Sequence, residues 1–161
     1  MKEISVITQS DNETRHIAEE FARELCAETN MCHVVSLEGE PGAGKTTFMQ
    51  GVGKGLCIKQ QMTSPTFIIF RVFDLPRGSS ASLRGLKKCI YKRLYHFDCY
   101  RLKSYEDLRA LDFEEIIANS KNLVIIEWGD MIKEHLPKDH IQIKFKGLSK
   151  DSREITIQHF L

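Results

Sequence analysis

Apolar and polar positions recur along the chain with two different periods, which divide it into predicted strands and helices. Residues that alternate with period 2, or short continuous apolar runs, predict strands at 3–7, 33–39, 66–73, 93–100, 122–128, 140–148 and 153–160. Apolar residues at helical spacing predict helices at 10–25 and 45–56, and one helix or two short ones at 104–120. Ser10 with Glu13 fits a capping box at the start of the first of these helices. Strands that alternate with helices in this way indicate an α/β domain.

Individual segments refine this fold prediction. Residues 122–128, NLVIIEW, are a continuous apolar run of the kind that is buried on both faces of a parallel sheet. Residues 140–148 and 153–160 alternate with period 2 and predict a half-solvated C-terminal β-hairpin. Residues 93–100 are expected to pair antiparallel with 66–73. The prediction is therefore a three-layer α/β fold, with a mainly parallel central sheet and antiparallel additions.

Length and composition favour one globular domain over residues 1–161. The chain has 161 residues, of which 42% are hydrophobic and 28% charged, enough for a single core. Its five cysteines form no CxxC pair, which argues against a disulfide framework or a zinc site and for a reducing compartment. The N-terminus lacks the apolar core of a signal peptide, and no apolar run approaches 18 residues. We expect a cytoplasmic protein.

The net charge of +1 conceals a basic segment in the middle of the chain. Between residues 71 and 93 one acid, Asp74, stands against seven basic residues, a local charge of +6: Arg71, Arg77, Arg84, Lys87, Lys88, Lys92 and Arg93. Gly, Ser, Pro and basic residues dominate here, which predicts a basic loop insertion at about 74–93. Its positive field would suit tRNA or an acidic partner surface, although a solvated variable loop has the same composition.

The stretch GEPGAGKT, residues 39–46, matches the P-loop pattern GxxxxGK[ST] at every fixed position, between a predicted strand and a predicted helix. Glycines let successive backbone N–H groups turn inward around an anion, and the helix N-terminus adds partial positive charge. Lys45 supplies a charge to the β- and γ-phosphates, and Thr46 a hydroxyl to Mg²⁺. We expect a P-loop NTPase fold in which consecutive residues hold the nucleotide: Gly42, Ala43, Gly44, Lys45, Thr46 and Thr47.

Two acidic positions are candidates for the second Mg²⁺ ligand that a P-loop requires. Glu127 directly follows the apolar residues LVII, at the end of a predicted buried strand, where P-loop proteins carry this acid. Asp130 competes for the role and is the better helix cap. A capping function at the strand exit is the alternative for Glu127 itself.

A second polar constellation lies in YHFDCYRL, residues 95–102. Strand alternation puts His96, Asp98 and Tyr100 on one face. Asp98 could lie beside the γ-phosphate and orient water or Mg²⁺, whereas the plainer interpretation is a half-buried strand with a polar face. Upstream, TSPTF, residues 63–67, occupies the place of a P-loop switch, where a hydroxyl can sense the γ-phosphate. A simple turn into a strand explains it equally well.

Taken in order, GEPGAGKTTF, SPTF, YHFDCYRL and VIIEWGD resemble the TsaE family, also called YjeE, and the resemblance runs from Ser10 to about Arg153. The resemblance implies an ATPase required to form N6-threonylcarbamoyladenosine at position 37 of tRNAs. Its ATP cycle would reset a complex of TsaD, which carries the transferase site, and TsaB. The segment between SPTF and YHFD is longer and more basic than the family pattern.

The resemblance also implies roles for individual residues. ATP and Mg²⁺ would be the cofactors, with Lys45 on the phosphates, Thr46 and Glu127 on Mg²⁺, and Asp98 as the acid needed for hydrolysis. Four further positions would complete the site: Trp128 as the family tryptophan, Asp11 and Thr14 on the adenine side, and Arg153 closing it.

Two other functions remain compatible with these motifs. In a small-molecule kinase, Asp98 would act as general base toward a substrate hydroxyl, although no arginine-rich lid is evident. In a nucleotide-gated, non-catalytic binding module, ATP would order the switch and hydrolysis would be incidental. A GTPase is disfavoured because the chain has no NKxD motif to read guanine.

Overall fold

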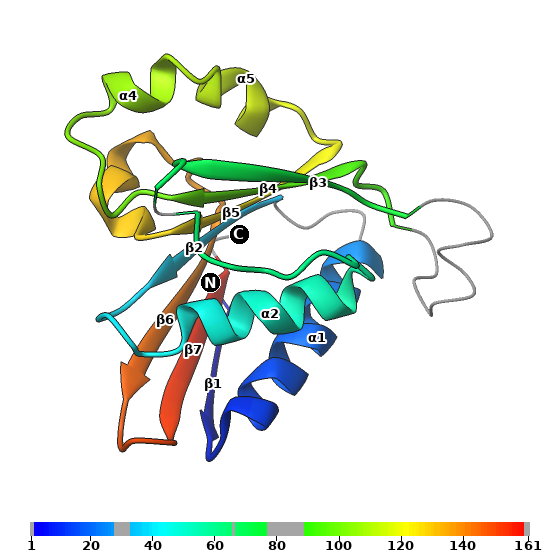
Figure 1. The fold of residues 1–161 in the computed structure, drawn as a ribbon, viewed down its shortest axis with the longest axis vertical. Coiled ribbons are helices and arrows are strands. Elements are labelled where there is room, and N and C mark those ends of the chain that lie inside the picture. The colour runs from blue at the N-terminus through cyan, green and yellow to red at the C-terminus, as the bar shows by residue number, and fades with distance from the viewer. Residues whose placement is uncertain (1, 28–32, 66, 77–88, 160–161) are drawn as a thin grey trace.

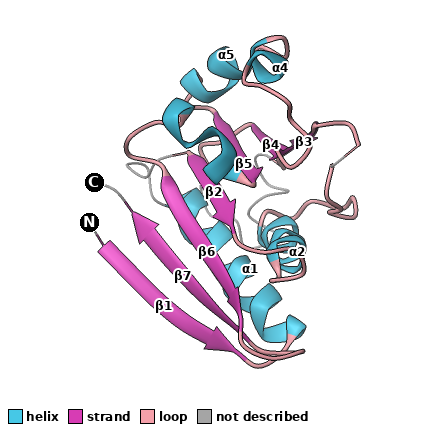
Figure 2. Cartoon of the chain, turned by 90° about the vertical axis from the view of Figure 1, so that its left-hand side faces the viewer, coloured by secondary structure: helices cyan, strands magenta, loops and turns pink. Residues whose placement is uncertain are grey.

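The computed structural model describes residues 2–27, 33–65, 67–76 and 89–159, which build one seven-stranded sheet with helices on both faces (Figures 1 and 2). The strands are β1 (Lys2–Thr8), β2 (Val34–Glu38), β3 (Phe70–Asp74), β4 (Arg93–Asp98), β5 (Asn122–Glu127), β6 (Ile141–Gly147) and β7 (Arg153–His159). The helices are α1 (Asp11–Ala27), α2 (Lys45–Gly55), α4 (Glu106–Arg109), α5 (Phe113–Ala118) and the 3₁₀ helix η1 (Gly129–His135).

The sheet has the strand order β1-β7-β6-β2-β5-β4-β3. Its centre is parallel, because β2 pairs in parallel with β5 and β6, and β5 with β4. The remaining pairs are antiparallel and include the predicted β6–β7 hairpin. Helices α1 and α2 cover one face of the sheet, and α5 and η1 lie on the other (Figures 1 and 2). The three-layer α/β fold is therefore confirmed, and β5 is buried along its whole length, as its apolar run predicts.

Helix α1 begins at the predicted capping box. The Ser10 hydroxyl accepts a hydrogen bond from the backbone N–H of Glu13 at 3.2 Å, and the Glu13 carboxylate accepts one from Gln9 N–H at 2.6 Å. Further along, α1 packs closely on α2, where a Cβ added to Gly51 would lie only 2.2 Å from the carbonyl oxygen of Arg15. This close contact holds α2, and with it the start of the helix at the P-loop, beside α1.

The predicted strand at 66–73 begins later than expected, because Phe67 to Ile69 form a turn and β3 starts at Phe70. The backbone N–H of Ile68 donates to the carbonyl of Pro65 at 2.9 Å. Ile69 has a φ of 65°, a left-handed conformation that is strained for a β-branched residue. Its carbonyl accepts the N–H of Asp98 at 2.8 Å, so this turn is tied to the end of β4.

The end of β4 also differs from the sequence prediction, whereas two short helices over 104–120 agree with one of the two predicted arrangements. Strand β4 pairs antiparallel with β3 as expected, but it ends at Asp98 and not at Tyr100. The reason is local, because the Asp98 carboxylate accepts the N–H of Tyr100 at 2.9 Å and turns the chain. The segment 104–120 forms two short helices, α4 and α5, separated at Asp112, which has a φ of 56°.

The cysteines correct the expectation that the chain carries no disulfide. Cys26 at the end of α1 is bonded to Cys89, across a sequence separation of 63. Sequence spacing did not reveal this pair because the fold alone brings the two positions together. Cys99 is fully buried, and burial raises the pKa of its thiol to about 12, so Cys99 is a packed and unreactive thiol.

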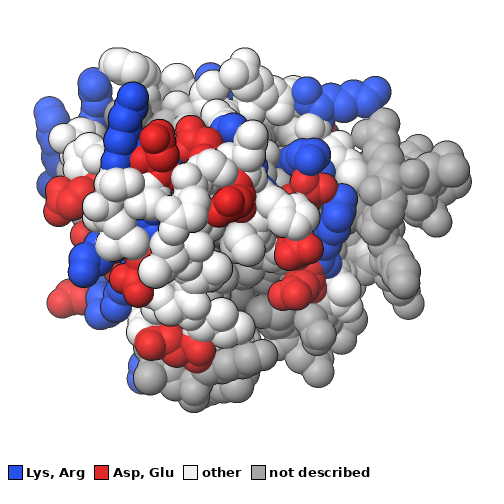
Figure 3. Space-filling model, turned by 90° about the horizontal axis from the view of Figure 1, so that it is seen from below, with Lys and Arg blue, Asp and Glu red and all other residues white. Residues whose placement is uncertain are grey.

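Most of the predicted basic insertion, residues 77–88, lies outside the described residues. The described residues on either side are joined by a hydrogen bond from Leu75 N–H to the Lys92 carbonyl at 3.0 Å. Within the described residues, none of the helices combines the length and apolar character that a membrane span requires. Figure 3 shows acidic and basic side chains interspersed over the face seen there, without a field of one sign.

Candidate functional site

Three strand ends meet at one edge of the sheet and define the site. Strand β2 runs directly into the P-loop, β4 ends at Asp98, and β5 ends at Glu127. In the parallel register Leu37 lies beside Glu127, and Glu127 lies beside Asp98. The phosphate-binding loop and both predicted carboxylates therefore share the carboxyl edge of the parallel strands, where open α/β sheets bind their ligands.

The P-loop reaches helix α2 through a glycine that no other residue could replace without strain. Gly44 precedes the first residue of α2 and has a φ of 112°. A Cβ at this position would also lie 2.7 Å from Cδ of Arg153. Lys45, Thr46 and Thr47 then form the first turn of α2, where backbone N–H groups without helical partners point toward the loop.

A cavity of about 350 Å³ lies in front of the P-loop. Eight of the residues that line it were predicted to belong to the nucleotide or metal site: Gly42, Gly44, Lys45, Thr46, Thr47, Asp98, Glu127 and Trp128. Three others that also line it complete the wall: Pro41, Ser64 and Tyr100. Ala43 is buried and does not line this cavity.

The Lys45 side chain turns back over its own loop at the edge of this cavity. Its Nζ donates hydrogen bonds to the carbonyl oxygens of Gly39 and, at 3.0 Å, Glu40, and it lies 3.9 Å from the centroid of the Trp128 ring. Burial lowers the pKa of Lys45, which is only 5% exposed, and the carboxylates of Glu127, Asp130, Asp98 and Glu40 oppose this shift. The buried ammonium group of Lys45 thus interacts with the carboxylates of Asp98 and Glu127 at the ends of β4 and β5.

Asp98 is buried at the end of β4 and is held from two sides. One carboxylate oxygen accepts the hydroxyl of Ser64, and the other accepts the backbone N–H of Tyr100 at 2.9 Å. Ser64 belongs to the predicted switch segment 63–67, so this segment contacts the carboxylate directly. The sequence predicted this segment as a switch that senses the γ-phosphate, with a simple turn as the alternative, but it did not predict the contact with Asp98.

Glu127 is buried at the end of β5, and its Oε1 lies 2.8 Å from Nε2 of His96. The sequence placed His96 on the same face as Asp98 without giving it a partner. The parallel pairing of β4 with β5 would have predicted this contact, because it places position 96 diagonally opposite position 127 on one face of the sheet. Asp130, the competing acid, is exposed at the start of η1 and does not line the cavity.

The oxygen atoms at the cavity fit a magnesium ion. The Thr46 hydroxyl and the Glu127 carboxylate both line it, and Mg²⁺ prefers one or two carboxylates together with waters and substrate phosphates. Among the described residues there is no cluster of three or more His, Cys, Asp or Glu side chains that could hold a metal. The donor set is therefore typical of an ion bound jointly with a nucleotide rather than by the protein alone.

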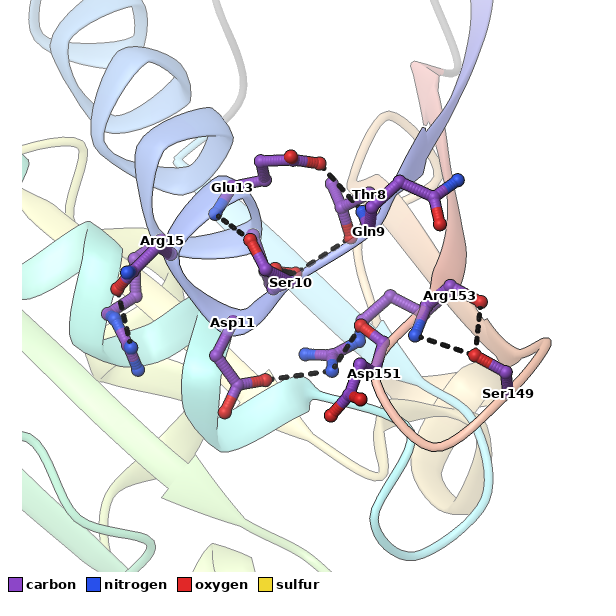
Figure 4. Close-up of polar contacts among 12 residues, drawn as sticks. Thr8, Gln9, Ser10, Asp11, Glu13, Arg15, Ser149, Asp151 and Arg153 are labelled. Atoms are coloured by element: carbon purple, nitrogen blue, oxygen red, sulfur yellow. Dashed lines mark hydrogen bonds and ion pairs between the residues drawn. The ribbon is translucent and has the colours of Figure 1, made fainter.

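Two of the residues predicted around the adenine side, Asp11 and Arg153, meet at the start of α1 (Figure 4). Arg153 Nη2 forms an ion pair with Asp11 Oδ1 at 2.8 Å, and the Arg153 side chain, 7% exposed, lies against Gly44. Thr14 is fully buried and its hydroxyl contacts Thr8 at 2.8 Å. None of Asp11, Thr14 and Arg153 lines the cavity, so their contact with adenine stays a prediction.

Trp128 offers a direct readout of the site because it is the only tryptophan in the chain. Its ring lies beside Lys45 Nζ and 4.8 Å from the ring of Tyr100. We expect added ATP to draw Lys45 toward the phosphates and to change Trp128 fluorescence saturably, as a titration would measure. Adenosine, which lacks phosphates, is the control and should leave the emission unchanged. Constant emission at ATP concentrations where calorimetry detects binding would contradict this arrangement of Lys45 and Trp128.

The chain is similar to a known protein family and to named members of it. Residues 8–155 match the model of the family described as "Threonylcarbamoyl adenosine biosynthesis protein TsaE". The protein named tRNA threonylcarbamoyladenosine biosynthesis protein TsaE is 33% identical in Rickettsia typhi, over 92% of this chain and 90% of the relative. The Bacillus subtilis protein of the same name is also 33% identical, over 97% and 85%. The crystal structure of Bacillus subtilis YdiB superimposes with a TM-score of 0.70 at 28% identity, covering 99% of this chain and 87% of that one.

Proposed function

The chain belongs to the TsaE family and acts in tRNA threonylcarbamoyladenosine biosynthesis, and from this premise we propose that it is the ATPase subunit of that process. ATP and Mg²⁺ are its cofactors in this proposal. The observation that carries it is the convergence of the P-loop, Asp98 and Glu127 on one cavity. A phosphate cradle that faces two buried carboxylates supports hydrolysis better than it supports phosphate binding alone.

Each side chain has a separate task in this proposal. The N–H groups of the P-loop and the Lys45 ammonium bind the β- and γ-phosphates, while Thr46 and Glu127 hold the metal ion. When bound, Mg²⁺ neutralises negative charge on the phosphate oxygens. Asp98 orients the attacking water and accepts a hydrogen bond from it, as its position at the cavity wall allows. Ser64 holds Asp98 and links it to the switch segment.

The partners in this proposal are TsaD and TsaB, and ATP hydrolysis resets their complex between turnovers. An exposed aromatic residue near the cavity supports a partner surface here. Phe67 is 84% exposed, and the Arg101 guanidinium lies 4.3 Å from its ring centroid, next to the cavity residue Tyr100. Phe67 adjoins Ile68, which is also exposed, and exposed apolar groups that lie together are typical of surfaces that another protein covers.

The experiment that tests the function measures ATP hydrolysis with Mg²⁺ by the purified protein alone and then with TsaD and TsaB. We expect slow hydrolysis that the partners stimulate, and none in EDTA. Phosphate transfer to a small metabolite without partners would overturn the proposal in favour of a kinase. Nucleotide binding without turnover under either condition would overturn it in favour of a nucleotide-gated binding module.

Contact with tRNA, through the complex or through the basic segment 71–93, stays a prediction. The described basic residues of that segment, Arg71, Lys92 and Arg93, are exposed, and Arg93 pairs with Asp74 at 3.3 Å. Exposed cations of this kind support binding to a polyanion only through local charge, since the whole chain is nearly neutral.

A further inference from the structure

The roles described so far leave a fully buried histidine beside the metal-binding carboxylate without a task. His96 lies in β4, two residues before Asp98, and has an exposed fraction of 0%. Its Nε2 is 2.8 Å from Oε1 of Glu127, which lies at the end of the neighbouring strand. Imidazole and carboxylate are thus in hydrogen-bond contact behind the wall of the cavity that Glu127 lines.

The direction of this hydrogen bond follows from the chemistry of its two partners. An ionised carboxylate only accepts, so His96 Nε2 carries the proton and donates it to Oε1. His96 Nδ1 is buried without a hydrogen-bond partner among the described residues. The proton on Nε2 is assigned from this contact with the carboxylate.

The strand register explains why this contact orients Glu127. In the parallel pairing of β4 with β5, His96 lies beside Ile125 and Asp98 beside Glu127, so His96 reaches Glu127 along the diagonal of one face. The strand holds the backbone of Glu127, whose carbonyl accepts the N–H of Cys99 at 3.0 Å. With the backbone held and Oε1 engaged by His96, the rotation of the carboxylate is restricted and Oε2 is left for a ligand in the cavity.

We infer that His96 is a positioning residue for magnesium: its Nε2–H holds Oε1 of Glu127 and thereby directs Oε2 to the ion. The inference rests on the proposed metal role of Glu127. Removing a hydrogen-bond partner of a metal ligand typically lowers metal affinity about 10- to 100-fold. A purely structural histidine would instead change folding or nucleotide affinity whether or not the metal is present.

Two amide substitutions separate these possibilities. The side-chain nitrogen of glutamine is as many bonds from Cα as Nε2 of histidine, so His96→Gln can still donate to Glu127. The nitrogen of asparagine corresponds in position to Nδ1, so His96→Asn keeps an amide but cannot reach Oε1. The measurement is the dissociation constant of a non-hydrolysable ATP analogue, by calorimetry, once with Mg²⁺ and once with EDTA. The dissociation constant in EDTA divided by the constant with Mg²⁺ reports how much the metal contributes to binding.

We expect His96→Asn to reduce this ratio about 10- to 100-fold, His96→Gln to keep it near the wild-type value, and both to leave the affinity in EDTA unchanged. In a Glu127→Gln background, His96→Asn should cause no further reduction, because the oriented oxygen is already lost. Binding of Mn²⁺ to the analogue complex, followed by electron paramagnetic resonance, should weaken in the same order of variants.

The possible failures are distinguishable. If the wild-type protein shows no effect of Mg²⁺ on analogue affinity, the metal site of the proposed function is wrong. If the wild-type ratio is large and His96→Asn preserves it, the metal site stands and the role of His96 is overturned. An equal reduction in His96→Gln and His96→Asn, or a loss of affinity in EDTA, would assign His96 to packing and would also overturn the inference.

Discussion

Replacement of Lys45 by alanine is expected to abolish measurable nucleotide binding. Lys45 is the buried cation of the cavity, and its Nζ already lies within hydrogen-bond distance of two P-loop carbonyls. Two charge-assisted hydrogen bonds to phosphate oxygens at about 1.5–3 kcal/mol each would be lost, about 3–6 kcal/mol together. That range corresponds to a loss of affinity of about 10²- to 10⁴-fold.

A second effect acts in the same direction. Without the ammonium of Lys45, the carboxylates of Asp98 and Glu127 lose the cation that interacts with them at the cavity. An anionic ligand would then approach an acidic wall, which disfavours binding further.

Equilibrium binding of ATP, measured by calorimetry, tests this prediction. Lys54→Ala is the matched control, because Lys54 lies in the same helix and is exposed. Its Nζ pairs with the Glu19 carboxylate at 2.7 Å, and Lys54 does not line the cavity. The control should bind ATP normally. A normal dissociation constant for Lys45→Ala would show that the phosphates are held elsewhere.

Replacement of Asp98 by asparagine is expected to leave nucleotide binding intact and to reduce turnover about 10²- to 10⁴-fold, the range of positioned acid–base groups. Asparagine keeps the size of the side chain. Its Oδ1 can still accept the N–H of Tyr100, and its Nδ2 can donate to the hydroxyl oxygen of Ser64. The substitution therefore removes the negative charge at the cavity wall while it preserves the turn at the end of β4. Asp98→Ala should act in the same direction but would also remove the acceptor that the Ser64 hydroxyl and the Tyr100 N–H share.

Steady-state ATP hydrolysis in the presence of TsaD and TsaB, together with binding of a non-hydrolysable analogue, separates these effects. Asp130→Asn serves as control, because Asp130 is exposed, acts on Lys45 electrostatically, and does not line the cavity. Its turnover should stay close to the wild-type rate. If Asp98→Asn hydrolyses ATP as fast as the wild type, the role of Asp98 in hydrolysis is wrong.

Local patterns were sufficient where a short segment determines its own conformation. The capping box at Ser10 and the apolar run of β5 predicted the start of α1 and a strand buried on both faces, and both are confirmed. Boundaries that depend on side-chain hydrogen bonds were less predictable. Asp98 ends β4 by accepting the N–H of Tyr100, and the turn before Phe70 shortens β3, although the local apolar pattern continues through both places.

The sequence by itself determined the phosphate cradle, because the chemistry of GxxxxGK[ST] between a strand and a helix lies within one short stretch of backbone. It also placed Glu127 at the end of a buried strand, and Asp98 within a strand that was predicted to continue to Tyr100. Only the tertiary structure decided which residues meet there: His96 contacts Glu127 across 31 positions, and Arg153 lies on Gly44 from the far end of the chain. Those contacts depend on the order and register of strands, which arise from packing the whole sheet and are not encoded in any local period.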